Sequence, residues 1–277
     1  MIPDPKLRSG LLATLILAAV ALNADAAQTV HGLTITSHRH RPIVIHHVRD
    51  TTVGSYNWSG YAVNGAVGSV TDVKGSWTVP TVTCAPGETS YSSFWAGIDG
   101  FNSSTVEQTG TDSDCQNGVP TYYAWFEFYP HPAFLINSMS IQPGDVIEAE
   151  VRYDPASRRF TAAINNVTTG QSFSTSTKVN GAKRSSAEWI AEAPSGFGGI
   201  LPLADFGTVV YGVDNTGVTG TSDATVNGTA APIGSFGSNV YQVTMVSQSN
   251  PALTKAAPSS LSSDGTSFSD VWVSSGP

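Results

Sequence analysis

The side chains best able to do chemistry in this sequence are carboxylates in two short aromatic segments. Glu188 and Glu192 lie in Ser-Ala-Glu-Trp-Ile-Ala-Glu, and Glu127 lies in Ala-Trp-Phe-Glu-Phe-Tyr-Pro. On an extended strand Glu188 and Glu192 share one face and are roughly 13 Å apart at the ~3.3 Å rise per residue. The paired carboxyl groups of glycosidases are only about 5 to 9.5 Å apart. An active glutamate here therefore needs a partner from another strand.

Gln108, in Val-Glu-Gln-Thr-Gly-Thr-Asp, is a candidate for that partner. The single change Gln108→Asp would create the Asp-Thr-Gly of an aspartic protease. As written, an amide that cannot titrate stands there, although its N–H can stabilise an oxyanion and its C=O can hold a water. Taken alone, Gln108 is more simply interpreted as an ordinary polar strand residue.

Other catalytic machinery is missing from the sequence. After residue 50 the only histidine is His131, which lies between two prolines in a predicted turn. No G-x-S-x-G, H-E-x-x-H, D-T-G or D-S-G occurs, which argues against a serine hydrolase elbow, a zincin and a paired-aspartate protease. Two cysteines do not make a zinc site, and we expect neither a metal nor a cofactor.

The elements that must position these residues are strands. Only 12% of the chain is Asp, Glu, Lys or Arg, and short runs rich in β-branched and aromatic residues recur between Gly, Pro, Asn and Asp. This pattern predicts two packed antiparallel sheets. The expected strands are 60–63, 75–80, 91–98, 122–129, 146–153, 160–164, 186–192, 206–213 and 240–246. The Ser-rich tail 247–277 is either a loose end or a terminal strand at 271–273.

Within the strand 122–129, alternation places Trp125 and Glu127 on the face opposite Phe126 and Phe128. One face is then typical of a core, and the other is an aromatic wall that carries a carboxylate. Ordinary packing of Trp125 and a solvated Glu127 remain open alternatives.

The first 26 residues read as a signal peptide. Lys6 and Arg8 precede an apolar run of about 12 residues, too short for the ~20 of a spanning helix, and Ala24-Asp25-Ala26 resembles a signal-peptidase site. No later segment is apolar enough to cross a membrane. We therefore expect a secreted, extracellular protein with one domain of about 250 residues.

A basic, histidine-rich leader follows at 27–52. Five of the six histidines lie between residues 31 and 47, together with Arg39, Arg41 and Arg49. The chain from residue 51 onward has 8 Lys and Arg against 18 Asp and Glu, which argues against nucleic acid as a partner and permits a working life in acid. A propeptide held partly by charge on the acidic domain 53–277 is the favoured interpretation. A metal-binding tract and a disordered leader are the alternatives. The charge pattern suggests processing near residues 49–55.

Cys84 and Cys115 are the only cysteines. In an oxidising compartment we expect them to form a disulfide, which would close a loop of about 30 residues and contribute on the order of 3 to 4 kcal/mol.

Several segments, in this order, closely resemble the glutamic peptidases, the eqolisin family of acid endopeptidases. They are Asn57-Trp58-Ser59-Gly60-Tyr61, Phe94-Trp95-Ala96-Gly97-Ile98-Asp99-Gly100, Glu107-Gln108-Thr109-Gly110-Thr111-Asp112, Ala124-Trp125-Phe126-Glu127-Phe128-Tyr129-Pro130, Ala187-Glu188-Trp189-Ile190-Ala191-Glu192 and Ala204-Asp205-Phe206-Gly207. Together they extend over most of the chain that follows the leader.

The resemblance implies a lectin-like sandwich of two antiparallel sheets with a concave substrate cleft. It implies that Gln108 and Glu192 are catalytic, and that the cleft binds protein or peptide substrates. The remaining motif positions in or near the cleft are Trp95, Asp99, Asp112, Trp125, Glu127 and Glu188. The favoured interpretation is a proenzyme whose basic propeptide occupies or screens the acidic cleft and is removed by the enzyme itself at low pH, and nothing in the sequence demands more than a monomer.

Two interpretations from other classes stay open. A carbohydrate-binding module could use Trp95 and Trp125 as stacking platforms, and a polysaccharide hydrolase could use Glu127 with Glu192 if their strands are adjacent.

Overall fold

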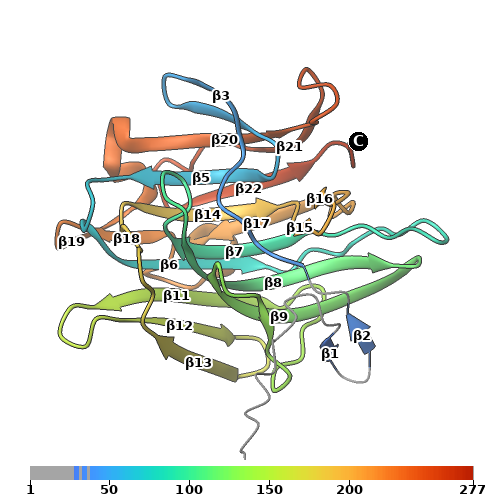
Figure 1. Cartoon of the computed structure of the whole chain (residues 1–277), viewed down its shortest axis with the longest axis horizontal. Helices are drawn as coiled ribbons and strands as arrows, with labels where there is room; N and C mark the ends of the chain where they lie inside the picture. The colour runs from blue at the N-terminus through green and yellow to red at the C-terminus, as the bar shows by residue number, and fades with distance from the viewer. Residues whose placement is uncertain (1–27, 31–32, 36–37, 277) are drawn as a thin grey trace, which may run out of the picture.

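The computed structural model describes residues 28–30, 33–35 and 38–276 (Figure 1). Regular structure in these residues is almost entirely β-strand, with a short helix α1 (Val213–Thr216) and the 3₁₀ segment η1 (Ile233–Asn239). None of the described helices is long and apolar enough to span a membrane. The expected signal peptide lies outside the described residues.

One layer, which we call the front sheet, follows from the strand pairings. Its order is β4–β20–β5–β14–β7–β8–β9–β10. All neighbours are antiparallel except β4 and β20. The strands are β4 (Thr52–Ser55), β20 (Val240–Val246), β5 (Trp58–Asn64), β14 (Ser186–Glu192), β7 (Ser93–Ile98), β8 (Val106–Gln116), β9 (Val119–Tyr129) and β10 (Phe134–Leu135).

The second layer, the back sheet, has the order β13–β12–β11–β6–β17–β22–β21. Its strands are β13 (Gln171–Thr177), β12 (Arg159–Asn166), β11 (Val146–Asp154), β6 (Val70–Thr78), β17 (Thr208–Gly212), β22 (Ser267–Trp272) and β21 (Thr254–Pro258). Because β20 also pairs with β21, the two layers belong to one closed hydrogen-bonded network.

Several shorter strands lie outside these two strand orders. β18 (Asp223–Val226) pairs with β6 and with β19 (Thr229–Pro232). β3 (Ile45–Arg49), exposed along its length, forms a hairpin with the largely buried β4. The pairs β1 (Gln28–Val30) with β2 (Leu33–Ile35) and β15 (Ser195–Gly196) with β16 (Gly199–Ile200) stand apart as two-stranded sheets.

The main core lies between the two layers. Trp77 of the back sheet and Phe94 and Trp189 of the front sheet are fully buried in it. Period-2 alternation then sends the neighbours of Phe94 and Trp189 to the other face of the front sheet, where Trp95 and Ile190 belong to a second buried cluster. The outer face of the front sheet is therefore also covered by another part of the chain.

The predicted sandwich is confirmed, as are the nine expected strands. The tail also contributes two strands, β21 and β22, to the back sheet. One long strand was missed: β8 was not among the expected elements, although it carries Gln108 and pairs along its whole length with β9. Its Gly, Thr, Asp and Ser residues are typical of turns.

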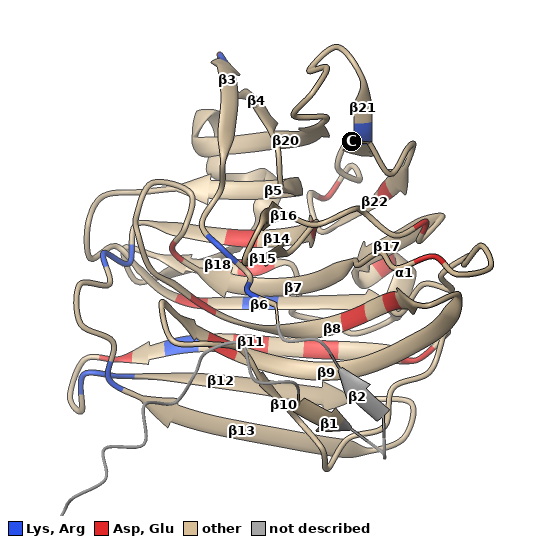
Figure 2. Ribbon diagram, turned by 45° about the vertical axis from the view of Figure 1, so that its right-hand side comes forward, with Lys and Arg blue, Asp and Glu red and all other residues tan. Residues whose placement is uncertain are grey.

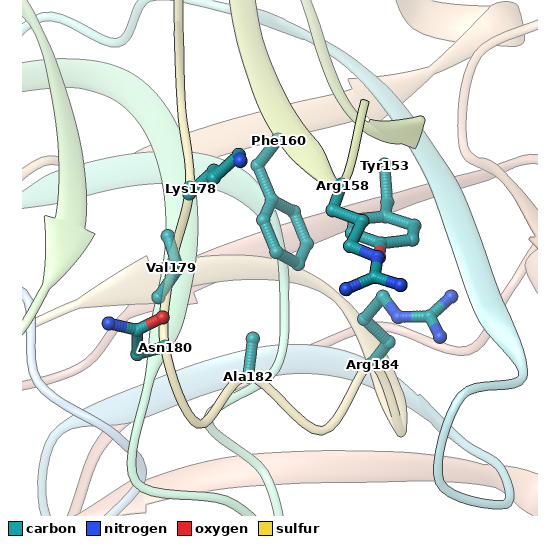
Figure 3. A pocket seen from close by; sticks show the side chains of 8 residues that line it. All are labelled: Tyr153, Arg158, Phe160, Lys178, Val179, Asn180, Ala182 and Arg184. Atoms are coloured by element: carbon teal, nitrogen blue, oxygen red, sulfur yellow. The ribbon is translucent and has the colours of Figure 1, made fainter. Parts of the chain in front are cut away.

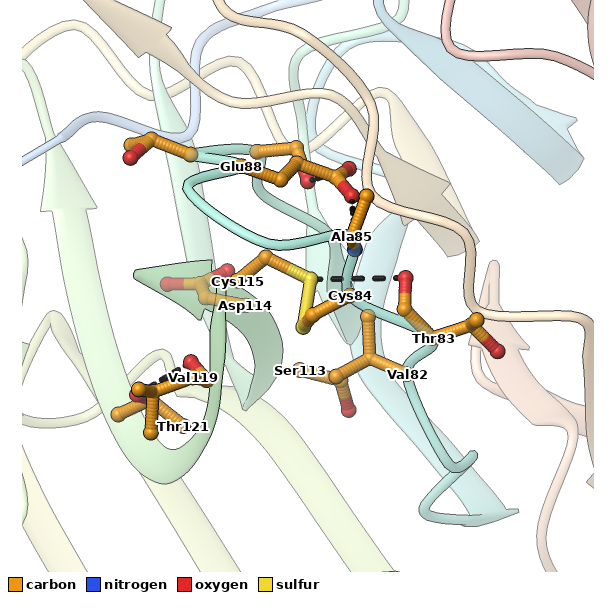
Figure 4. Close-up of a disulfide and its surroundings, with 12 residues drawn as sticks. Val82, Thr83, Cys84, Ala85, Glu88, Ser113, Asp114, Cys115, Val119 and Thr121 are labelled. Atoms are coloured by element: carbon orange, nitrogen blue, oxygen red, sulfur yellow. Dashed lines mark hydrogen bonds between the residues drawn. A yellow bond between two sulfur atoms is a disulfide. The ribbon is translucent and has the colours of Figure 1, made fainter. Parts of the chain in front are cut away.

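The expected disulfide joins Cys84 and Cys115, with Cα atoms 5.5 Å apart (Figure 4). It links the segment before β7 to the end of β8, beside the buried side chains of Val82 and Ala204. The bond thus ties down one end of the β8–β9 hairpin, which carries much of the candidate site.

Candidate active site

Alternation gathers the main site candidates on the outer face of the front sheet. β7 contributes Trp95, β8 contributes Gln108 and Asp112, β9 contributes Trp125 and Glu127, and β14 contributes Glu192. All six side chains are fully buried. Six polar and aromatic side chains cannot be buried on an outer face unless another part of the chain covers them.

The cover is the leader. Residues 38–44, which we call the leader segment, cross the front sheet before entering β3 (Figure 1). Arg39 exchanges two backbone hydrogen bonds of 2.9 Å with Ser195, and Ile43 N–H donates to the carbonyl of Gly100. Figure 2 shows this basic segment against strands that carry acidic residues.

The peptide unit between His40 and Arg41 meets both proposed catalytic side chains. Gln108 Nε2 donates to the carbonyl oxygen of His40 at 2.7 Å. The backbone N–H of Arg41 donates to Glu192 Oε1 at 3.2 Å. An amide and a carboxyl group from separate strands thus contact the two ends of one peptide bond.

Each catalytic candidate has further contacts that fix its orientation. Trp95 Nε1 donates to Glu192 Oε2 at 2.8 Å, which leaves Oε1 turned to the leader. Gln108 Nε2 lies 3.3 Å from Glu127 Oε2, while Gln108 Oε1 is buried without a hydrogen-bond partner among the described residues. The Nε2 group of Gln108 therefore donates hydrogen bonds, while its Oε1 remains available as an acceptor.

The imidazole of His40 fills a tight aromatic and acidic pocket. It stacks on Trp125 with ring centroids 3.5 Å apart and 2° between the planes. Its Nδ1 lies 3.1 Å from Glu127 Oε2, and its Nε2 lies 2.9 Å from Ser93 Oγ. Burial disfavours the imidazolium, but hydrogen bonds to Asp112 and Glu127 outweigh it and raise the pKa of His40 to about 10.

Two residues earlier, His38 Nε2 lies 2.6 Å from Asp112 Oδ2. Trp125 Nε1 and Tyr123 Oη both donate to the same carboxylate, and Tyr123 also donates to Asp114. Burial alone would raise the pKa of Asp112, but the two histidines of the leader hold it well below its usual range. The ionised carboxylate of Asp112, hydrogen-bonded to His38 and close to the imidazolium of His40, therefore anchors the leader segment.

The pKa of Glu192 is shifted in the opposite direction from that of Asp112. Burial raises its pKa to about 8; the charge of His40 opposes this rise, and Glu127 adds to it. Burial likewise raises the pKa of Glu127, against the hydrogen bond from His40. With the leader in place, Glu192 therefore holds its proton across the acidic and neutral range.

Two further predicted site residues, Asp99 and Glu188, have surroundings that differ from those of Gln108 and Glu192. Asp99 follows β7 with a positive φ of 71°, and its carboxylate accepts the backbone N–H groups of Arg184 and Ser185, so it holds the loop before β14. Glu188 shares a row of the front sheet with Gln108, separated by Gly97. Burial, and then the charge of Asp99, raise its pKa well above the usual range.

Three groups could hold a metal ion by geometry. His38, His40 and Asp112 offer ligand atoms within 4.8 Å of one another, and three protein ligands are the usual number for a catalytic zinc. These atoms are already used in hydrogen bonds to one another, to Ser93 and to Glu127. Two of the three ligands belong to the leader, so such an ion would not belong to a leader-free enzyme.

A separate hollow of about 350 Å³ lies at the far end of the back sheet (Figure 3). Tyr153, Phe160 and the loop after β13 line it, and the guanidinium of Arg184 lies 4.1 Å from the centre of the Tyr153 ring. None of the site candidates lines this hollow.

Sequence reasoning missed the two histidines that enter the site and the serine beneath them. The concentration of histidine and arginine was the available signal for His38 and His40, and it indicated a propeptide at the acidic cleft without indicating which of its residues enter the site. Ser93 and Asp114 gave no signal, since serine and aspartate are ordinary turn residues in this composition.

Comparisons with known proteins agree with the geometry. The model of the peptidase A4 family matches residues 56–263. Aspergillopepsin-2 of Aspergillus niger is 33% identical over 198 residues, which are 62% of this chain and 69% of that protein. Scytalidopepsin B of Scytalidium lignicola is 34% identical over 148 residues, 52% of this chain and 54% of that protein.

Solved structures give the same result. Scytalido-glutamic peptidase with a transition state analog inhibitor has a TM-score of 0.63 and 25% identity, covering 79% of this chain and 98% of that one. Aspergilloglutamic peptidase from Aspergillus niger has a TM-score of 0.52 and 26% identity, covering 66% and 99%. Since the family model extends over more than half of the sequence, the chain belongs to the peptidase A4 family, and its resemblance to the glutamic peptidases is confirmed.

Proposed function

We propose that this chain is a secreted acid endopeptidase, made as a proenzyme, in which Gln108 and Glu192 together hydrolyse peptide bonds of protein substrates. The observation that carries the assignment is that both side chains contact one peptide unit, Gln108 at its carbonyl oxygen and Glu192 at its nitrogen. A hydrolase needs this arrangement, because charge develops on the oxygen and the nitrogen must leave with a proton.

Gln108 would act without changing its protonation state. Its N–H group donates to the carbonyl oxygen and can stabilise the negative charge that forms there on attack. Its free Oε1 is a hydrogen-bond acceptor that can orient the attacking water. Because an amide is neutral at every working pH, this contribution is the same in acid as at neutrality.

Glu192 would move the protons. In its ionised form the carboxylate accepts a proton from the attacking water. In its protonated form it gives that proton to the leaving nitrogen, whose N–H already donates to Oε1 in the leader complex. Trp95 keeps the other oxygen fixed throughout. With the leader displaced, water reaches Glu192 and its pKa falls toward the ordinary glutamate value of about 4.3, so that the carboxyl group exchanges protons readily in acid.

The leader, 27–52, would be the propeptide. Its segment 38–44 covers both catalytic candidates, and its histidines His38 and His40 lie against carboxylates of the front sheet. A substrate cannot reach Glu192 while Arg41 N–H occupies Oε1. The expected signal peptide and the disulfide fit export of such a latent form.

The decisive test is Glu192→Gln, which keeps the shape and removes the proton transfer. We expect hydrolysis of denatured casein at pH 3 to 4 to fall by at least ~10²-fold, the usual contribution of a positioned acid or base. Glu150→Gln, at a part-exposed carboxylate of β11 that pairs with Lys74, is the matched control and should keep full activity. The Glu192 variant should retain its far-ultraviolet circular dichroism. Near-normal turnover in that folded variant would refute the assignment.

A further inference from the structure

We propose that the enzyme cuts its own His40–Arg41 bond in cis, and that the leader segment is bound as a substrate and not merely as a plug. The inference rests on the proposed roles of Gln108 and Glu192. It is more specific than the charge pattern, which pointed only to residues 49–55. Those residues lie in the β3–β4 hairpin, whose β4 strand pairs with β20.

The orientation of the leader segment is the one that hydrolysis requires. A blocking peptide bound in reverse would present its N–H to Gln108 and its carbonyl to Glu192. Here the carbonyl of His40 faces the amide donor at 2.7 Å, and the nitrogen of Arg41 faces the carboxyl group at 3.2 Å. Within the leader segment, this peptide unit is the one that both side chains contact.

The flanking contacts hold that bond in register from both sides. Upstream, His38 is anchored on Asp112 and Arg39 forms a backbone bridge with Ser195. At the bond itself the ring of His40 is clamped on Trp125. Downstream, Asn57 binds the backbone of Val44, with Nδ2 also close to the carbonyl of Pro42. A shift by one residue would break all of these contacts at once.

The chemical step balances without any other reactant. The oxygen of a water bonds to the carbonyl carbon of His40, and the water gives one proton to Glu192 in its ionised form, which is the minor form under the leader and the form that the charge of His40 favours. The carbon–nitrogen bond then breaks, and the nitrogen of Arg41 takes that proton. The products are a carboxylic acid at His40 and a free amine at Arg41, and Glu192 is again ionised.

Cutting this bond would explain how latency ends. While the chain is intact, residues 38–40 bind as a tethered ligand at a high effective concentration. After the cut they are an ordinary product that dilutes into solution. Val44 and Ile43 keep their contacts with Asn57 and Gly100, but Arg41 is then a chain end that is no longer held from both sides, so its nitrogen can leave Glu192.

The experiment is to purify the full chain at neutral pH, bring it to pH 3 to 4, and determine the new amino terminus over time by sequencing and intact mass. We expect Arg41 as the first new terminus, appearing with a first-order rate that is the same over a hundredfold range of protein concentration. A first terminus elsewhere, or a rate proportional to concentration, would overturn the proposal. Digestion of casein in the same samples tests the proposed function separately.

Arg41→Pro removes the N–H that faces Glu192 and should slow this cut at least ~10-fold. Arg49→Ala, which removes an exposed leader cation, is the control and should be processed like the wild type. A readout free of folding effects is a synthetic peptide of residues 33–46 given to the processed enzyme. Products 33–40 and 41–46 are expected; cleavage at any other bond, or none while casein is digested, counts against the proposal.

Discussion

At the scale of single residues, the site is unusual in placing one amide, that of Gln108, among several buried carboxyl groups. Gln108 is neutral, yet its neighbour Glu127 and the nearby Asp112 and Glu192 are all acidic and fully buried. The Nε2 group lies 3.3 Å from Glu127 Oε2 while it donates to the leader carbonyl. A donor that cannot lose its proton keeps this interaction attractive at every pH.

Gln108→Glu is therefore expected to abolish activity although it changes the size of the side chain hardly at all. The new carboxyl group lacks the N–H that faces the substrate carbonyl, and it places a second titrating carboxyl group beside Glu127. We expect kcat for casein at pH 3 to 4 to fall by at least ~10²-fold, as for loss of an oxyanion donor.

The control for this change is Gln142→Glu, at an exposed position outside the site, which should leave kcat unchanged. If Gln108→Glu turned over substrate at the normal rate, Gln108 would have no part in the mechanism.

Residues with a motif position could be predicted from the sequence, and those without one could not. Gln108, Glu192 and Trp95 were expected at the site, and all three meet the leader or the catalytic carboxyl group there. Asp99 was placed in the same group, but it holds a loop. His38 and His40 enter the site from far along the chain, and no local pattern encodes such a contact.

At the scale of elements, the β8–β9 hairpin does most of the positioning. β8 is buried along nearly its whole length, yet it carries Asp112 and Asp114 on the same face as Gln108. Tyr123 of β9 bridges the two aspartates, and Trp125 donates to Asp112. The polarity of β8 is thus satisfied across the hairpin, which is why a strand of turn-like composition stays in the sheet.

Gly110, between Gln108 and Asp112, lets two tryptophans approach the strand. A Cβ atom there would lie 2.7 Å from Trp95 Cβ, 3.0 Å from Trp125 Cζ2 and 2.3 Å from the carbonyl oxygen of Phe94. Gly110→Ala should therefore push the tryptophans out of place. We expect a loss of about 1 to 3 kcal/mol in the free energy of unfolding, typical of overpacking, and a lower kcat/KM.

Urea unfolding followed by tryptophan fluorescence measures the first effect, and casein digestion measures the second. Gly198→Ala, where a Cβ would meet no atom within 4 Å, should change neither. If Gly110→Ala proved as stable and as active as the parent, close packing at this position would not be needed.

The difference between β8 and its neighbours also explains what the sequence could predict about elements. β9 and β14 place aromatic or aliphatic residues, such as Phe128 and Trp189, at every second position, on the face that packs in the core. β8 gives no such alternation, since Thr109 and Thr111 occupy its core side and bond to β9 and to Trp77. Hydrophobic periodicity cannot detect a strand whose buried face is polar.

At the scale of the whole molecule, charge is divided between two parts of the chain. The leader is basic and the body is acidic, and they meet at the site (Figure 2). The body keeps few cations that could repel one another once its carboxylates are protonated. Acid therefore protonates carboxylates of the body without generating a large repulsion within the sandwich, while Asp112, whose pKa the leader holds well below its usual range, stays ionised.

Buried carboxyl groups give the sandwich a preference for acid. Burial raises the pKa values of Glu107, Glu188 and Asp270 well above their usual range. Near pH 7 the folded chain thus holds protons that the unfolded chain has released. The free energy of unfolding must then increase as pH falls from neutrality toward about 4, where the unfolded carboxyl groups also become protonated.

We accordingly expect the thermal midpoint of the folded chain to rise by at least ~3 °C between pH 7.5 and pH 4.5, given that about 1 kcal/mol shifts it by about 2 to 4 °C in a chain of this size. The measurement is made in the Glu192→Gln background, which prevents digestion during heating. Adding Glu188→Gln removes one of the titrating groups and should flatten the slope with pH, whatever it does to the midpoint itself. Glu148→Gln, on a half-buried carboxylate of β11, should leave the slope unchanged. A midpoint that fell on acidification would mean that the buried carboxyl groups are ionised in the folded chain.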